Sequence, residues 1–417
     1  MRDRARARTA RGAEAPALAV MGLLAVSLAT LACGAGGPAV APRPSPRAVI
    51  LVSFDGFRHD YATRAPTPGF DRIAALGAHA DALAPPFPTQ TFASHAALAT
   101  GASADRHGIV NNVFRDRARG EFRYGADVGW YDVPPLWIHA TWGGARAAVS
   151  HWVSCAGAWH GIAPWRTVPF DKSVSDDARI AEASVWLAAP PTERPRLIML
   201  YLSGCDRAGH DHGPDSPEIV ACVARVDAQV RRLMGVVDAA SGPTTLVLVS
   251  DHGMTQTLGA LNPEAALRAA GVDAQVRAAG PVAHVYTDDA ATLARARLAL
   301  EALDHARVYT PETLPPEWRY RRADRTGDLV VVADAGWVHD TDLPGLTSPP
   351  TGAGHHGHPA EHPDMPGILY LWGDGVRPGG RVARARTVDV FPTVAALLDL
   401  PPAPWVEGEV LRALVAP

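Results

Sequence analysis

AVILVSFD, residues 48–55, is an unbroken apolar run that closes on an aspartate, and the same pattern occurs twice more along the chain. LIMLYLSGCD spans residues 197–206, and TLVLVSD spans residues 245–251. Runs rich in Val, Ile and Leu without polar alternation are typical of strands covered by helices on both faces. We therefore predict three buried, parallel strands, each followed by an acidic side chain.

Helical patterns separate these runs. One is GFDRIAALGAHA at residues 69–80; the longest covers residues 216–240, with Ser216 as N-cap and Pro217 at the first helical position. Alternating strands and helices predict an α/β fold: a doubly wound, mostly parallel sheet with helices on both faces. Ligands bind such sheets beyond the carboxyl ends of the strands, so the three aspartates are placed to converge.

A second α/β region interrupts this pattern at about residues 262–342. We therefore predict one catalytic domain over residues 48–417 that carries a small inserted α/β subdomain. Within and after the insertion, we expect strands or helices at residues 282–287, 288–303, 328–334, 368–375 and 388–400.

The N-terminus is typical of a targeting segment. Five arginines between Arg2 and Arg11 precede an apolar stretch at residues 19–32, which is shorter than the roughly 20 residues that span a bilayer. The stretch ends at Cys33 in a sequence that resembles a bacterial lipobox except at Thr30, and residues 34–47 form a Pro- and Gly-rich tether. We predict a signal peptide over residues 1–33, export to the periplasm or cell surface, and membrane attachment through lipid on Cys33. Plain secretion and an uncleaved anchor are the alternatives.

Charge and cysteine content narrow the function classes further. A formal net charge of −4 over 417 residues gives no reason to expect nucleic acid as a specific partner. The four cysteines lack the spacing of a Cys-rich zinc site. If Cys33 carries lipid, Cys155, Cys205 and Cys222 allow at most one disulfide, and we interpret Cys205 as a small packing residue.

Four separate fragments combine aspartate or histidine with glycine: they begin at Ser53, Asp206, Asp251 and His355, and the first contains Asp55. Asp206 and His210 are four residues apart, which places them on one side of a helical turn. Taken alone, each aspartate is typical of a turn or of a helix cap. Taken alone, the histidine-rich tract is typical of a solvated loop. Together, three aspartates and three histidines can hold two divalent ions, and a donor set without cysteine suits catalytic zinc.

A hydroxyl-rich stretch, FPTQTFASH at residues 87–95, accompanies these fragments. In order along the chain, six motifs resemble the type I phosphodiesterase/nucleotide pyrophosphatase family of the alkaline phosphatase superfamily. They are DGFRHDY (55–61), FPTQTFASH (87–95), HGIVNN (107–112), DRAGHDHGP (206–214), SDHGM (250–254) and HHGHPAEHPDM (355–365).

The resemblance implies two Zn²⁺ ions and a threonine nucleophile, Thr91, that forms a phosphothreonine intermediate. It implies that Thr89 is structural, while we expect Ser94 and His95 to start the following helix. Gln90 and Ala93-Ser94 depart from the lysine and Pro-Asn common in the family. The implied metal ligands are Asp55, Thr91, Asp251 and His252 for one ion, and Asp206, His210 and His356 for the other.

The resemblance also implies how substrate would be held. Asn112 would donate to a non-bridging phosphate oxygen together with the Phe92 backbone N–H, since a neutral amide suits a monoanionic diester. Phe92 and Tyr201 would stack on a nucleobase, with Trp165 as the third aromatic wall.

Three functions therefore stay open. The leading hypothesis is hydrolysis of nucleotide phosphodiester or pyrophosphate bonds, releasing nucleoside 5′-monophosphates. The second keeps the site but changes the substrate to a phospholipid head-group diester or a phosphomonoester. The third is a non-catalytic surface binding lipoprotein. A sulfatase is disfavoured because the nucleophile turn lacks Cys-x-Pro-x-Arg.

Overall fold

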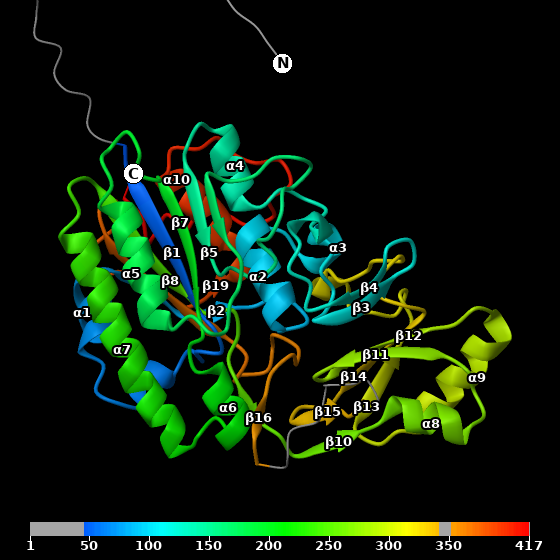
Figure 1. The fold of residues 1–417 in the computed structure, drawn as a ribbon. Coiled ribbons are helices and arrows are strands. Elements are labelled where there is room, and N and C mark those ends of the chain that lie inside the picture. The colour runs from blue at the N-terminus through cyan, green and yellow to red at the C-terminus, as the bar shows by residue number, and fades with distance from the viewer. Residues whose placement is uncertain (1–45, 342–351, 417) are drawn as a thin grey trace, which may run out of the picture. The chain divides into compact units, whose positions relative to one another are not determined.

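A computed structural model describes residues 46–341 and 352–416 (Figure 1). Within them the main sheet has nine strands in the order β18-β2-β17-β8-β1-β7-β5-β6, with β19 also pairing β2. Only β17 runs antiparallel to its neighbours, so the predicted mostly parallel sheet is confirmed. The strands are β1 (Ala48–Phe54), β2 (Ala78–Ala84), β5 (Ala147–Ser150), β6 (Arg166–Val168), β7 (Leu197–Leu202), β8 (Thr244–Val249), β17 (Gly367–Gly373), β18 (Gly380–Val382) and β19 (Ala385–Arg386).

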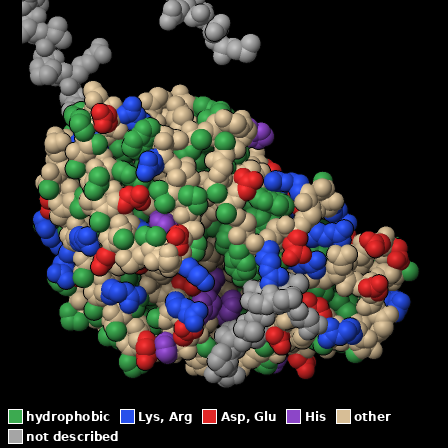
Figure 2. Space-filling model, viewed as in Figure 1, with side chains coloured by type: hydrophobic (Ala, Val, Ile, Leu, Met, Phe, Trp, Pro, Cys, Tyr) green, Lys and Arg blue, Asp and Glu red, His purple; other side chains and the backbone are tan. Residues whose placement is uncertain are grey.

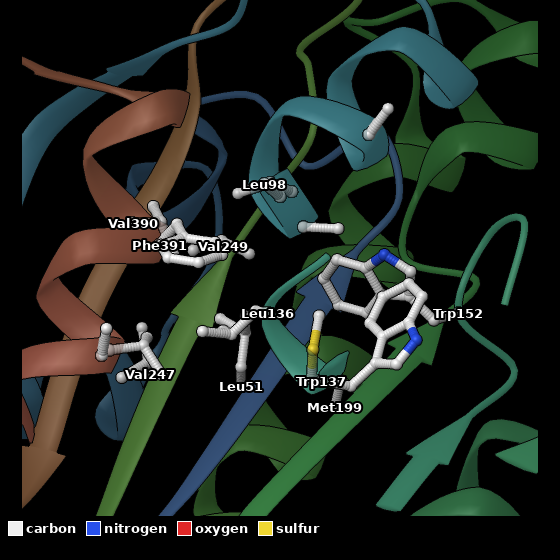
Figure 3. Packing of buried hydrophobic residues seen from close by; sticks show 14 of the residues in the cluster. Leu51, Leu98, Leu136, Trp137, Trp152, Met199, Val247, Val249, Val390 and Phe391 are labelled. Atoms are coloured by element: carbon white, nitrogen blue, oxygen red, sulfur yellow. The ribbon is translucent and has the colours of Figure 1, made fainter. Parts of the chain in front are cut away.

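Helices cover both faces of this sheet (Figure 1). Alternate residues of β1 enter different cores: Val49 and Leu51 pack with one helix layer, and Ile50 and Val52 with the other. Figure 3 shows the first core, where Leu51 lies among side chains of the helices above the sheet. The first layer contains α2 (Thr91–Thr100), α4 (Leu136–Trp142) and α10 (Val390–Leu397); the second contains α1 (Pro68–Leu76), α5 (Asp176–Leu187) and α7 (Pro217–Asp238).

Three local predictions were wrong. The helix expected to run to Ala80 ends at Leu76, because Gly77 passes so close to β17 that a Cβ there would lie 2.3 Å from the Leu371 carbonyl oxygen. The helix expected to start at Ser94 begins at Thr91, and Ser94 is buried inside it. Cys205 is not a plain packing residue, because it forms a disulfide with Cys222.

The inserted region forms its own sheet and core. Its four-stranded antiparallel sheet, in the order β11-β12-β14-β13, packs with α8 and α9 around buried Val and Leu side chains. Asp289 caps α9 by accepting from two backbone N–H groups. The elements are α8 (Pro263–Ala269), β11 (Gln275–Ala279), β12 (Val282–Tyr286), α9 (Ala290–Glu301), β13 (Ala306–Tyr309) and β14 (Leu329–Ala333), flanked by the pair β10 (Gly259–Leu261) and β15 (Trp337–His339).

Smaller elements surround the carboxyl edge of the main sheet: α3 (Ala104–His107), the hairpin β3 (Val113–Asp116) and β4 (Gly120–Arg123), α6 (Asp206–His212), and the pair β9 (Thr255–Gln256) and β16 (Gly354–His355). The predicted signal peptide, with Cys33, and nearly all of the predicted tether lie outside the described residues. Across residues 46–341 and 352–416, no helix is both long and apolar enough to cross a membrane.

Candidate active site

Three neighbouring strands bring the three aspartates together. β7, β1 and β8 are adjacent and parallel, so Asp206, Asp55 and Asp251 follow their carboxyl ends at one edge of the sheet. Two glycines permit this approach. A Cβ on Gly56 would lie 2.7 Å from the Asp206 Cα, and one on Gly204 would lie 2.1 Å from the Asp55 carbonyl oxygen; both have positive φ. The β1 and β7 ends can therefore meet only with glycine at these positions.

The first group of metal-binding donors comprises Asp55, Asp251 and His252, all buried, with their ligand atoms within 4.8 Å of one another. His252 Nε2 lies 3.4 Å from Asp55 Oδ1 and 3.2 Å from Asp251 Oδ2. The other ring nitrogen of His252, Nδ1, contacts the Gly253 carbonyl oxygen at 2.9 Å. Because a carbonyl can only accept, Nδ1 carries the proton and Nε2 is left as a donor to a metal.

The second group, Asp206, His210 and His356, has the same arrangement. Nε2 of His210 and of His356 lie 3.3 and 3.6 Å from Asp206 Oδ1. Their Nδ1 atoms contact the backbone carbonyl oxygens of Gly354 and Thr89, both at 3.0 Å. The rings of His252 and His356 stack with centroids 3.6 Å apart, so the two groups adjoin.

The donor atoms fit divalent cations. One buried oxygen of each aspartate makes no hydrogen bond: Asp55 Oδ1, Asp206 Oδ1 and Asp251 Oδ2. Burial, followed by the nearby charges of Asp251 and Asp206, raises the pKa of Asp55 well above its ordinary value. A buried set of repelling carboxylates is costly unless cations compensate it. Oxygen and imidazole donors without cysteine are the ligands of catalytic zinc sites, so the residues fit the predicted metal.

Thr91 lies beside the first group. It is the first residue of α2, and its Oγ1 is 3.1 Å from His252 Nε2. The backbone carbonyl of Thr91 is in turn held by His95 Nδ1 at 2.8 Å, which also lies 3.2 Å from Asp251 Oδ2. Thr89 bonds to backbone, as expected, although its partners lie in the distant His-rich loop: its Oγ1 donates to the His358 carbonyl at 2.8 Å and accepts from Gly357 N at 2.9 Å.

Asn112 lies next to the start of α2. Its Oδ1 accepts from the Phe92 backbone N–H at 3.0 Å, so the two groups expected to hold phosphate contact each other directly. Asn112 Nδ2 donates to Gln90 Oε1 at 3.0 Å.

An aromatic cavity of about 250 Å³ opens beside Thr91. Phe92 and Tyr201 both line it, and the Tyr201 hydroxyl donates to Asp55 Oδ2 at 2.5 Å. In Figure 2, histidine side chains gather in the middle of the face shown, next to hydrophobic surface. The other lining residues include Tyr124, Trp152 and Phe170.

Trp165 does not line this cavity. Its side chain is 46% exposed, and the Arg146 guanidinium lies 5.8 Å from its ring centroid. Phe170, which lies beyond the other end of β6, faces Tyr201 edge-on with centroids 5.7 Å apart. The stretch APWRTVPFD contains both aromatics, and nothing in the sequence showed which of them lines the cavity.

Comparison with known proteins identifies the family. A model of the family described as type I phosphodiesterase/nucleotide pyrophosphatase matches residues 49–358. The chain belongs to this family. It is therefore a hydrolase of the phosphodiesterase type with the alkaline phosphatase-like fold.

Relatives of this phosphodiesterase agree in sequence and in structure. Human ectonucleotide pyrophosphatase/phosphodiesterase family member 5 is 29% identical over 371 residues, covering 86% of this chain and 76% of the relative. Human family member 1 is 27% identical, but this chain spans only 40% of its length. The solved murine family member 5 superposes with a TM-score of 0.80 at 28% identity, over 88% of this chain and all of that chain. An inactive threonine-to-alanine variant of the murine protein, solved in complex with AMP, has a TM-score of 0.78 at 28% identity and covers 86% of this chain and 96% of that chain.

Proposed function

We propose that this chain is a metal-dependent nucleotide pyrophosphatase/phosphodiesterase that releases nucleoside 5′-monophosphates. The observation that carries the proposal is the position of Thr91: a hydroxyl at a helix N-terminus, 3.1 Å from His252, beside two groups of metal-ligand donors. A threonine hydroxyl by itself is a weak nucleophile. Coordination to a metal ion can activate it, and the adjacent donor groups would hold such an ion.

In this proposal Asp55, Asp251, His252 and the Thr91 oxygen hold one Zn²⁺, and Asp206, His210 and His356 hold the second. When bound, such ions lower the pKa of a coordinated hydroxyl and neutralise charge that develops on phosphate. The three Nδ1–carbonyl contacts fix the imidazoles with Nε2 toward the carboxylates, which orients the ligands before any metal arrives.

The reaction then has two steps. Thr91 Oγ1 loses its proton to solvent and bonds to phosphorus as the bond to the leaving oxygen breaks. The leaving oxygen takes a proton from water, and a phosphothreonine that keeps its nucleoside ester remains. Water then cleaves the Thr91–phosphorus bond and releases the nucleoside monophosphate. Asn112 has a second Nδ2 hydrogen beyond the one given to Gln90, next to the Tyr124 hydroxyl, and we assign that hydrogen to a non-bridging phosphate oxygen when substrate is bound. A donor in this position contributes about 3 kcal/mol to the transition state.

The cavity supports a nucleotide as substrate. Phe92, Phe170 and Tyr201 offer aromatic surface next to Thr91, and stacking on a base contributes about 1–3 kcal/mol. The AMP bound to the related murine protein supports the same class of ligand. We therefore place the base in this cavity and the phosphate at Thr91.

A phospholipid head-group diester is the second candidate, since the cavity lining is mostly apolar and aromatic and contains no charged side chain. A phosphomonoester is less suited, because a dianionic group calls for a cation where this chain has the neutral Asn112. Hydrolysis of p-nitrophenyl thymidine 5′-monophosphate, p-nitrophenylphosphorylcholine and p-nitrophenyl phosphate, each with and without chelator, separates these substrates. We expect the nucleotide diester to be cleaved fastest, and chelator to stop the reaction.

Faster cleavage of the choline diester would favour the lipid substrate. Chelator-insensitive turnover would contradict the metal proposal, and purified protein that holds no zinc and cleaves none of the three would favour a binding lipoprotein. We also propose export with lipid attachment at Cys33, in keeping with relatives named ectoenzymes. Mass analysis of the protein isolated from membranes tests this attachment.

A further inference from the structure

A line of hydrogen bonds runs from the nucleophile turn to the inserted subdomain through two side-chain amides. The Phe92 N–H donates to Asn112 Oδ1 at 3.0 Å, and Asn112 Nδ2 donates to Gln90 Oε1 at 3.0 Å. Gln90 Nε2 then donates to the carbonyl oxygen of Ala279, the last residue of β11, at 3.0 Å.

The two ends of this line fix the orientation of both amides. Its first group is a backbone N–H, which can only donate, so the Asn112 atom facing it must be the oxygen. Its last group is a backbone carbonyl, which can only accept, so the Gln90 atom facing Ala279 must be the nitrogen. No other assignment of the two carboxamides satisfies all three bonds.

The Gln90 side chain lies in a tight space that exists only because two of its neighbours are glycines. Its side chain is buried, with 1% exposed. Gly280, at the tip of the β11–β12 hairpin, and Gly357, next to His356, both have positive φ, and a Cβ on either would lie 2.4 or 2.3 Å from Gln90 Nε2. Three distant segments therefore close around one amide.

We propose that Gln90 is the positioning residue for Asn112, and that through it the inserted hairpin sets the direction of the phosphate donor. This inference rests on the proposed role of Asn112 in binding phosphate. A carboxamide is planar, so occupying Oδ1 and one Nδ2 hydrogen fixes where the second Nδ2 hydrogen points. Without Gln90 the amide can rotate, and a small misplacement of a donor costs up to about 100-fold in rate.

A double-mutant cycle between Gln90→Met and Asn112→Ala tests this coupling in zinc-loaded protein with p-nitrophenyl thymidine 5′-monophosphate. Methionine keeps the length of the side chain and removes both hydrogen bonds. We expect Gln90→Met to lower kcat by about 10- to 100-fold with KM changed less than about threefold, because the aromatic cavity is untouched. In the Asn112→Ala background, the same change should lower kcat by less than about twofold.

A further variant separates positioning from loss of packing. Gln229→Met removes a buried carboxamide from α7, away from the site, and should leave kcat unchanged.

Additive effects in the cycle, or normal kcat in Gln90→Met, would overturn the inference while leaving the proposed function intact. The binding of AMP to the zinc-loaded variants, measured by calorimetry, gives a second readout that needs no turnover. Weakening of about two- to threefold in Gln90→Met, the range also expected for KM, that disappears in the Asn112→Ala background supports the coupling even if the diester is not a substrate. Equal AMP affinity in wild type and Gln90→Met, or no detectable binding to wild type, counts against it.

Discussion

Tyr201 contributes to two parts of the site at the scale of one residue. Its ring lines the aromatic cavity, and its hydroxyl donates to Asp55 Oδ2 at 2.5 Å. The other oxygen of Asp55 makes no hydrogen bond and faces His252 at 3.4 Å. The phenol therefore selects which carboxylate oxygen is left for a cation.

Tyr201→Phe should consequently weaken zinc binding and lower kcat by about 10- to 100-fold, the usual effect of losing a hydrogen bond to a metal ligand. KM for the nucleotide diester should change little, because the ring remains. Competition with a zinc chelator, alongside steady-state kinetics, measures both effects. Unaltered zinc affinity in Tyr201→Phe would contradict this role. Tyr201→Leu also removes the ring from the cavity, so this variant should raise KM as well as weaken zinc binding.

Phe170 and Trp165 form a matched pair of exposed aromatics on either side of β6, 52% and 46% exposed. Only Phe170 lines the cavity. Phe170→Ala should raise KM for the nucleotide diester by about 5- to 100-fold, which corresponds to the loss of one stacking contact. Trp165→Ala should leave KM unchanged. The reverse pattern in steady-state kinetics would place the base in a different position.

At the scale of elements, the disulfide joins two helices next to the site. Cys205 and Cys222 are 17 residues apart and link the residue just before α6 to the second turn of α7. Because α6 carries Asp206 and His210, this crosslink holds two of the three residues of the second donor group against a long helix. Closing a loop of this length stabilises a fold by about 3 kcal/mol.

Replacing both cysteines by alanine should therefore lower Tm by several degrees and weaken the binding of one of the two zinc ions. Thermal unfolding and zinc titration of the double variant measure the two effects separately. Unchanged Tm and unchanged affinity for both ions would mean that the crosslink supports neither α6 nor the site.

The inserted subdomain carries a buried histidine on β12. Burial lowers the pKa of His284 from its ordinary value of 6.5 to about 4. Its Nδ1 contacts the Thr326 carbonyl at 3.1 Å, and its Nε2 contacts the Tyr320 hydroxyl at 3.1 Å. His284 is therefore neutral in the folded protein at neutral pH. As the pH is lowered, it takes up a proton at a higher pH in the unfolded chain than in the folded one.

The lowered pKa of His284 predicts how the stability of the fold depends on pH. Between pH 6.5 and about pH 4 the unfolded chain binds more protons at His284 than the folded chain does. The free energy of unfolding that His284 contributes therefore decreases as the pH is lowered through that window. The total loss is about 3 kcal/mol. The stability difference between wild type and His284→Gln should shrink across this range in denaturant unfolding with chelator present throughout. A difference that stays constant with pH would show that His284 is not neutral and buried as described.

The whole molecule shows why some of the site could be predicted and some could not. Asp55, Asp206 and Asp251 were predictable because parallel neighbouring strands end at one edge, and apolar runs mark such strands. The partner of Cys205 was not, because sequence does not fix disulfide pairing. Gln90 touches Ala279 only because the inserted hairpin folds back onto the nucleophile turn, a contact across 189 positions that no local pattern encodes.

The central claim is that distant segments assemble two cation sites around one threonine oxygen. Its most direct test is turnover of p-nitrophenyl thymidine 5′-monophosphate by zinc-loaded Thr91→Ala, with zinc content measured on the same sample. We predict that turnover falls by more than about 1,000-fold while both ions stay bound through the six Asp and His ligands. Turnover equal to that of the wild type, with zinc present, would contradict the claim.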